Sequence, residues 1–477
     1  MSPPLEVAVV GHTNAGKTSL LRTLARRRDV GEVSPSPATT RRVEPIALRV
    51  DGVEAIVLLD TPGLEDSIGL LEAVDAATAD RRADRIAALE SFLASPAATR
   101  EYPQEIQALG AARRAELMLA VIDARDRVLP RHLDELELLG RCGRPVVPVL
   151  NFVASADADA EAWRASLGRL GMHAVVAFDT VAYEVEDERR LFEAIRTLVP
   201  EHRGAIDRLL EARQRERDRR RTASASRIAD LLLDAASMAI EVQKADGDEG
   251  AAADSALDAL RDRLRNLEHA AHLELLAIAG FDADDAAVAE AALESFDVGV
   301  DLFSPEAFKT AGFSAATGAA AGAATGAAID LAVGGMSLGA AAALGAAIGG
   351  VLGAAGRHAR KISLLARGGR EVLVGDASLS LLAARAIALV RGLERRGHAS
   401  VEPLALGAGS STATPRDLSK VVKPLREVRS RLASPATSDA APSVARERFR
   451  TEIAALVVAE LAELAELVES STSSRLP

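Results

Sequence analysis

The sequence predicts an α/β domain, with a mainly parallel sheet covered by helices on both faces, followed by a mainly α-helical C-terminal region. Residues 1–200 alternate continuous apolar runs of strand length with helix-forming stretches, which is typical of parallel strands buried on both faces. From about residue 201 onward the pattern favours helix almost throughout. The two parts of the chain therefore have different predicted architectures.

Length and composition exclude several classes of protein. At about 150 residues per domain, 477 residues suggest two to four domains. An apolar fraction of 48% and a charged fraction of 26% exclude wholesale disorder and collagen-like structure. The net charge of −12 argues against a general polyanion binder, and the chain has no specific nucleic-acid-binding pattern. A single cysteine, Cys142, fits a reducing cytoplasm and is expected to be structural.

Five apolar runs are the predicted strands of the first domain: residues 5–10, 54–60, 117–123, 145–150 and 174–178. Residues 64–116 have helical character and are long for one connection, so we expect a helical insertion there. No basic stretch precedes an apolar one at the start of the sequence, so no cleaved secretory signal is expected. These features assign residues 1–200 to one domain.

The helical part divides by composition into residues 201–309, 310–356 and 357–477. Six arginines and two acidic residues between Arg213 and Arg221 predict a solvated connector helix, and two further helices are expected within residues 226–280. His269 and His272 share a helical face, but without a clear third ligand they predict structural residues rather than a metal site. The amphipathic final helix, residues 444–470, is expected to pack in a core.

Residues 310–356 contain one charged residue, Asp330, and are otherwise almost all Ala, Gly and small apolar residues. The stretches on either side of Asp330 are long enough to cross about 30 Å of hydrocarbon as helices. Glycines recur every four residues, which allows close helix packing, and Arg357 follows as expected of a cytoplasmic flank. We expect a membrane-associated helical hairpin, and a tight hairpin buried in its own domain is the alternative.

A glycine-rich loop follows the first predicted strand and precedes a helix predicted to begin near Lys17. Its residues read Gly-x4-Gly-Lys-Thr from Gly11 to Thr18. In such a loop, backbone N–H groups and the helix N-terminus surround a phosphate. The lysine reaches the β- and γ-phosphates, and the threonine hydroxyl ligates Mg²⁺. The motif predicts the P-loop NTPase fold for residues 1–200.

A second motif, from Asp60 to Gly63, follows the next predicted strand. A carboxylate at a strand end can hold Mg²⁺ through water, and the Gly63 N–H can face a γ-phosphate. Between the two motifs, residues 38–41 lie in a Pro/Ser-rich stretch that could fold over the nucleotide. The candidate nucleotide-binding residues are Gly11, His12, Thr13, Asn14, Ala15, Gly16, Lys17, Thr18, Ser19, Asp60, Gly63 and Asn151.

The order and spacing of these motifs resemble those of translation-factor-like small GTPases, in particular the Era/TrmE-like branch, over about residues 5–200. The resemblance implies that Thr40 closes onto Mg²⁺, with Thr39 as the alternative. It implies that Asn14 coordinates K⁺, and that Leu64 stands where Ras-like proteins have a water-orienting glutamine. The whole chain resembles a bacterial group in which such a GTPase domain is fused to an uncharacterised helical C-terminal region.

The base-recognition motif departs from that family. The family has Asn-Lys-x-Asp, whereas this chain has Asn151, Phe152, Val153 and Ala154. Residues 179–182 match the later base-recognition loop only loosely. Guanine selectivity therefore rests on the resemblance, and a site without the aspartate is expected to bind GTP weakly or to accept ATP.

We therefore expect a Mg²⁺-dependent GTPase, with K⁺ as a further ion, coupled to a membrane-associated helical domain. The candidate catalytic residues are Lys17, Thr40 and Asn14, and the candidate metal ligands are Thr18, Thr40 and Asp60. Expected partners are GTP and GDP, an inner-membrane lipid or membrane protein, and a second copy of the chain through the nucleotide-binding domain. The expected location is the cytoplasm, at the inner membrane. The alternatives are a membrane-interaction or membrane-remodelling protein with little hydrolysis, and a P-loop NTPase with relaxed base specificity.

Overall fold

The computed structural model describes residues 3–26, 43–77, 84–241, 249–281, 371–396, 418–432 and 441–473. The chain forms two compact units, one of Met1–Glu216 with Arg395–Val401 and one of Arg217–Glu394 with Glu402–Pro477. Thr39, Thr40 and the Gly/Ala-rich residues 310–356 lie outside the described residues, so the roles expected of them stay predictions. The predicted four-part division of the chain likewise stays a prediction.

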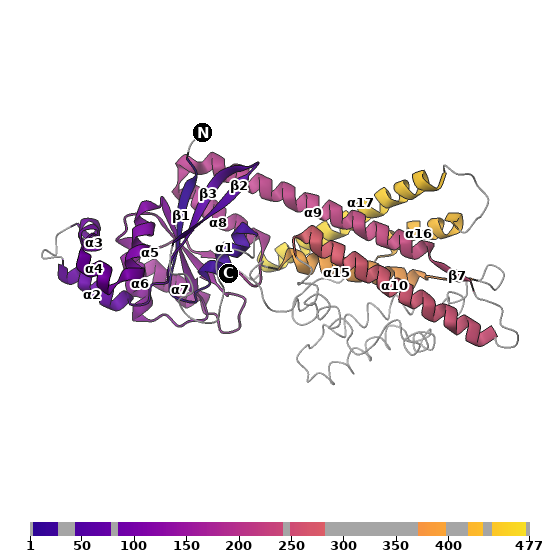
Figure 1. Ribbon diagram of the computed structural model, residues 1–477, viewed down its shortest axis with the longest axis horizontal. Coiled ribbons are helices and arrows are strands. Elements are labelled where there is room, and N and C mark those ends of the chain that lie inside the picture. The colour runs from indigo at the N-terminus through magenta and orange to yellow at the C-terminus, as the bar shows by residue number, and fades with distance from the viewer. Residues whose placement is uncertain are drawn as a thin grey trace. The chain divides into compact units, whose positions relative to one another are not determined.

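The first unit is built on a six-stranded sheet with the strand order β2-β3-β1-β4-β5-β6 (Figure 1). All neighbouring strands are parallel except β2 and β3, which are antiparallel. The predicted α/β architecture with a mainly parallel sheet is therefore confirmed. The strands are β1 (Leu5–Val10), β2 (Glu44–Val50), β3 (Val53–Asp60), β4 (Leu117–Asp123), β5 (Val146–Asn151) and β6 (Val176–Ala177).

The edge strand β2 is absent from the predicted strands. Its buried residues, Ile46, Leu48 and Val50, alternate with more exposed ones, so β2 is no continuous apolar run. An edge strand that buries one face has this period of two. Continuous apolar runs therefore identify the strands that are covered on both faces, but they do not identify β2.

Helices cover both faces of the sheet because successive strand residues point to opposite sides. In β1, Leu5, Val7 and Val9 pack in one apolar layer, whereas Ala8 and Val10 pack in the other. The first layer includes α1 (Lys17–Ala25), α8 (Val185–Leu198) and the first turns of α9 (Arg203–Ser237). The second includes α2 (Ser67–Ala77), α3 (Arg85–Leu93), α5 (Pro103–Arg114), α6 (Pro130–Gly140) and α7 (Ala160–Arg169). Helices α2 to α5, with α4 at Pro96–Glu101, occupy the predicted helical insertion.

The second unit is helical, as the sequence predicts. The rest of α9 packs with α10 (Glu249–Ala279), α15 (Asp376–Glu394), α16 (Ser419–Leu432) and α17 (Ala441–Ser473) around one apolar cluster. A two-stranded antiparallel sheet joins β7 (Ala239–Glu241) to β8 (Glu371–Leu373). Residues 226–280 contain the end of α9 and the whole of α10, so only one of the two further helices expected there is separate from the connector helix.

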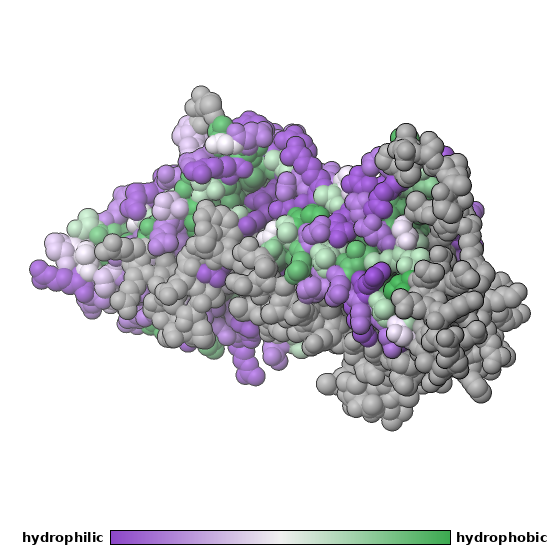
Figure 2. Space-filling view, turned by 45° about the vertical axis from the view of Figure 1, so that its right-hand side comes forward, coloured by the Kyte–Doolittle hydropathy of each residue, from purple (hydrophilic) through white to green (hydrophobic). Residues whose placement is uncertain are grey.

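The final helix, α17, packs in the core of this unit as its pattern predicts. Phe449, Ile453 and Leu461 are buried in the apolar cluster. Arg450 forms an ion pair with Asp230 of α9, at the rim of the same contact. Hydrophilic residues form much of the described surface visible in Figure 2, with apolar residues in small patches between them. Among the helices that the structure describes, none combines the length and the apolarity needed to cross a membrane.

The two histidines of α10 have different surroundings. His269 is exposed, whereas His272 is 3% exposed and lies 3.8 Å from a carboxylate oxygen of Glu268. Arg385 of α15 pairs with the same oxygen of Glu268 at 2.9 Å. Burial, and to a lesser degree the charge of Arg385, lowers the pKa of His272 to about 3. Within the described residues no group of three or more His, Cys, Asp or Glu side chains could hold a metal ion.

The buried imidazole of His272 makes the second unit sensitive to acid. Its pKa is about 3 when folded and about 6.5 when unfolded, so the unfolded chain binds more protons between these values and stability falls as the pH drops below 6.5. We expect His272→Leu to remove about 2 kcal/mol of the stability lost between pH 7 and pH 5. Urea unfolding of the helical unit at both pH values measures the difference. His269→Gln is the exposed control, and equal pH dependence in all three proteins would contradict the assignment.

Candidate nucleotide-binding site

The loop between β1 and α1 curves around the N-terminus of α1. Gly16 precedes Lys17, the first residue of the helix, and has a φ of 92°. A Cβ atom at Gly16 would lie 2.2 Å from Nδ2 of Asn151, so both its conformation and its surroundings require glycine. The loop therefore directs the start of α1, where backbone N–H groups lack helical partners, toward the end of the sheet.

The side chain of Lys17 lies within this loop and is 7% exposed. Its Nζ donates hydrogen bonds to the carbonyl oxygens of Gly11 and His12, both at 2.8 Å. Burial lowers the pKa of Lys17, and the nearby carboxyl group of Glu135 opposes that shift. A buried ammonium group beside free helical N–H groups attracts an anion.

The expected metal ligands Thr18 and Asp60 lie next to each other. The Thr18 hydroxyl donates to Oδ2 of Asp60 at 3.1 Å, and Asp60 is 1% exposed at the end of β3. Thr61 anchors the following turn by donating its hydroxyl to the carbonyl oxygen of Val9 at 2.7 Å. A hydroxyl and a carboxylate oxygen are the hard donors that Mg²⁺ prefers.

Gly63 lies directly against the phosphate-binding loop. A Cβ atom there would be 2.4 Å from the hydroxyl oxygen of Thr13, so no larger residue fits this position without movement. The turn after β3 and the loop after β1 are therefore in contact at the edge of the sheet where both strands end.

Asn151, at the end of β5, connects three segments of the site. Its buried Nδ2 donates to the carbonyl oxygen of Ala15 at 3.0 Å. Its Oδ1 accepts from the backbone N–H of Phe152 and from both the N–H and the hydroxyl of Thr180, at 2.9 to 3.1 Å. The loop after β1 and the loops after β5 and β6 are thereby held together by one amide group.

The departures from the base-recognition motif form a compact arrangement of their own. Phe152 has a φ of 58°, and the guanidinium carbon of Arg125 lies 4.0 Å from the centre of its ring. The buried carboxylate of Asp179 accepts from the N–H of Ala154 at 2.9 Å. It also accepts from the N–H groups of residues 181 and 182, so it holds both base-side loops in place.

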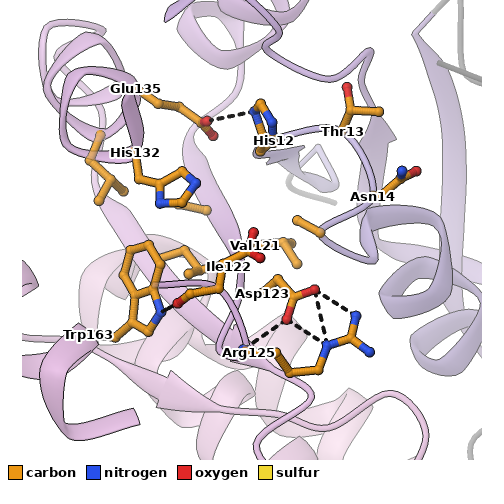
Figure 3. A pocket seen from close by; sticks show the side chains of 14 residues that line it. His12, Thr13, Asn14, Val121, Ile122, Asp123, Arg125, His132, Glu135 and Trp163 are labelled. Carbon is orange, nitrogen blue, oxygen red and sulfur yellow. Dashed lines mark hydrogen bonds and ion pairs between the residues drawn. The ribbon is translucent and has the colours of Figure 1, made fainter. Parts of the chain in front are cut away.

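A cavity of about 280 Å³ adjoins the outer side of the phosphate-binding loop, between the end of β4 and helices α6 and α7 (Figure 3). Glu135 of α6 lines it and is 6% exposed, with Oε2 3.8 Å from Nδ1 of His12. Burial raises the pKa of Glu135 to about 8, although Lys17 opposes the shift. His132 also lines the cavity and stacks at an angle on Trp163, with ring centres 5.3 Å apart.

The remaining candidate residues are less enclosed. Asn14 is exposed with a φ of 66°, and Ser19 is half-buried in the first turn of α1. Residue 40 lies outside the described part of the chain. In the sequence, Glu135 has the pattern of an ordinary charged residue of an amphipathic helix and does not stand out. The loop that contains Thr180 matches the later base-recognition loop only loosely. Only the bond from Asn151 identifies Thr180 as part of the site.

Two family models match the chain. Residues 164–456, more than half of the chain, match a domain of unknown function named DUF3482. The chain belongs to the DUF3482 family. Residues 6–152 match the model described as 50S ribosome-binding GTPase, so this DUF3482 protein carries an N-terminal GTPase domain.

Named GTPases are similar to part of the chain. The tRNA modification GTPase MnmE of Chelativorans sp. (strain BNC1) is 37% identical over 116 residues, 24% of this chain and 25% of the relative. The GTPase Der of Xanthomonas campestris pv. campestris (strain B100) is 29% identical over 195 residues, 41% of this chain and 35% of the relative. A crystal structure of Era with MgGDPNP and a 16S ribosomal RNA segment is 20% identical with a TM-score of 0.30, covering 42% of this chain and 57% of that one. The chain spans less than half the length of these curated GTPase relatives.

Removal of the Asn151 amide tests its connecting role. In Asn151→Ala the groups on Ala15, Phe152 and Thr180 lose a buried partner, so we expect the first unit to lose about 2–4 kcal/mol of stability. Chemical denaturation measures this loss. Asn266→Ala, at an exposed position of α10, is the matched control and should change stability by less than about 0.5 kcal/mol. If both variants were equally stable, Asn151 would not connect the loops energetically.

Proposed function

We propose that this DUF3482 protein binds GTP at the loop between β1 and α1 and hydrolyses it to GDP and phosphate. The observation that carries the proposal is the convergence of the buried Lys17, the Thr18–Asp60 pair and the Asn151 amide on that loop. The GTPase domain that residues 6–152 match supports it.

The residues of the loop bind phosphate by charge and by backbone donors. Phosphate oxygens take the place of solvent at the first N–H groups of α1, where the helix dipole favours negative charge. The Lys17 ammonium group, which in this structure caps the carbonyl groups of Gly11 and His12, can turn toward those oxygens. Because burial disfavours the charged form of Lys17, a bound anion restores the balance of charge in the loop.

The donor set at Thr18 and Asp60 fits Mg²⁺. A hydroxyl and a buried carboxylate 3.1 Å apart would hold the ion, and we propose that Thr40 supplies a further oxygen. When bound, Mg²⁺ neutralises the charge that develops on the phosphate oxygens during transfer. The residues of the chain orient the nucleotide: Lys17 and the Gly63 N–H contact the terminal phosphate, and Asn14 is proposed to hold K⁺.

A second candidate function is nucleoside triphosphate hydrolysis with relaxed base specificity. The observation that favours it is the arrangement after β5, where Phe152 replaces lysine and Ala154 replaces the aspartate of the GTPase motif. Arg125 covers the Phe152 ring, and Asp179 is engaged by three backbone N–H groups. An aromatic ring stacks on any base, whereas discrimination needs a group that hydrogen-bonds the base edge.

The proposal extends to the helical part on the strength of the sequence alone. We propose that residues 310–356 associate with the inner membrane from the cytoplasm, that lipid or a membrane protein is the partner there, and that the GTPase domain pairs with a second copy. A protein that remodels or binds membranes with little hydrolysis is the alternative, and turnover measurements distinguish it.

Replacement of Lys17 tests nucleotide binding and turnover together. We expect Lys17→Ala to weaken GTP and GDP binding by at least about 100-fold, because the phosphates lose their buried cation. Binding is measured by calorimetry and turnover by phosphate release, with Mg²⁺ present. Lys423→Ala, at an exposed lysine of α16, is the control and should match the wild type. Equal affinity in the Lys17 variant and the wild type would exclude the proposed phosphate site.

The double variant Phe152→Lys with Ala154→Asp tests base choice. It restores the carboxylate that accepts from a guanine edge, so we expect the preference for GTP over ATP to rise by about tenfold or more. Competition binding of GTP and ATP to both proteins measures the ratio. A wild type that already rejects ATP by about a thousandfold would show that another group reads guanine.

A further inference from the structure

The side chain of His12 bonds the phosphate-binding loop to the residue that follows Gly63. Its Nδ1 lies 2.8 Å from the carbonyl oxygen of Leu64. Since a carbonyl oxygen only accepts, Nδ1 carries the proton and donates it. The backbone N–H of Leu64 donates in turn to the carbonyl oxygen of Gly11 at 3.3 Å, so two bonds join these segments.

Leu64 is held from its other side as well. Its side chain is fully buried in the layer that contains Ala8, Val10 and Leu70. The backbone of Leu64 is therefore held between its own packed side chain and the imidazole of His12. Gly63, the preceding residue, lies against Thr13 of the phosphate-binding loop, and its N–H is the group expected to face the terminal phosphate.

The surroundings of His12 are polar, and its side chain is partly exposed. Oε2 of Glu135 lies 3.8 Å from the same Nδ1 atom, and the ring of His132 is 6.0 Å from the His12 ring (Figure 3). Both separations exceed hydrogen-bond distance, so the Leu64 carbonyl oxygen is the acceptor that orients the imidazole. The imidazole also lines the cavity between α6 and the loop.

We propose that His12 is a positioning residue that holds the Gly63 N–H against the phosphate-binding loop and so favours GTP over GDP. The proposal rests on the proposed function, because it concerns the response of the same site to the terminal phosphate. His12 acts through the Leu64 backbone and touches no reacting atom. Its loss therefore affects the state with three phosphates more than the state with two.

Two substitutions separate the hydrogen bond from the ring. His12→Asn places Nδ2 at the same number of bonds from the backbone as Nδ1 of histidine, so the donor to Leu64 is retained. His12→Ala removes it. His132→Ala removes an imidazole from the same cavity without touching Leu64, and serves as the matched control.

The full-length protein and the three variants are compared in two measurements. The first is the ratio of Kd for GDP to Kd for a non-hydrolysable GTP analogue, and the second is kcat for GTP. We expect His12→Ala to lower both by about two- to tenfold, the range of one hydrogen bond. We expect His12→Asn and His132→Ala to stay within about twofold of the wild type, below the loss of a typical hydrogen bond.

The proposal is overturned by an unchanged His12→Ala variant, by an Asn variant as impaired as the Ala variant, or by an equal loss in His132→Ala. An equal weakening of GDP and analogue binding in His12→Ala would also overturn it, since the histidine would then only support the loop. If the wild type binds both nucleotides but hydrolyses none, the proposed function fails while the binding ratio still decides the role of His12.

Discussion

One buried amide group holds the nucleotide-binding side of this protein together. Asn151 bonds to the loop after β1, to its own loop after β5 and to Thr180 after β6. These loops follow strands that run parallel, so their ends meet at one edge of the sheet without any direct covalent link. The shape of the phosphate-binding loop therefore depends on a residue 136 positions away in the sequence.

The electrostatics of the phosphate-binding loop follow from the same enclosure. Burial lowers the pKa of Lys17 and raises that of Glu135 to about 8, so both groups are disfavoured in their charged forms. Perturbed pKa values cluster at functional sites, which agrees with the place of both residues at the phosphate-binding loop.

The sequence predicts those features of this protein that depend on one continuous stretch of residues. The phosphate-binding loop is a continuous motif, and strands β1, β3, β4 and β5 are continuous apolar runs, so both can be read without tertiary information. Strand β2 escapes that reading because its burial alternates. Thr180 and Glu135 escape it because their places in the site arise only when the loops after β5 and β6 and helix α6 meet the phosphate-binding loop. Polar residues of this kind look the same in sequence as solvated ones.

Cys142, the only cysteine of the chain, lies behind the site in the layer formed by α6 and its neighbours. Its thiol donates to the carbonyl oxygen of Leu138, and burial raises its pKa to about 12. Alkylating reagents need access to the sulfur and a thiolate. In the native fold the sulfur is buried, and its raised pKa keeps it protonated. The rate at which Cys142 is alkylated therefore depends on how often the surrounding layer opens transiently. The native thiol of Cys142 can therefore report local opening of this layer without an engineered label.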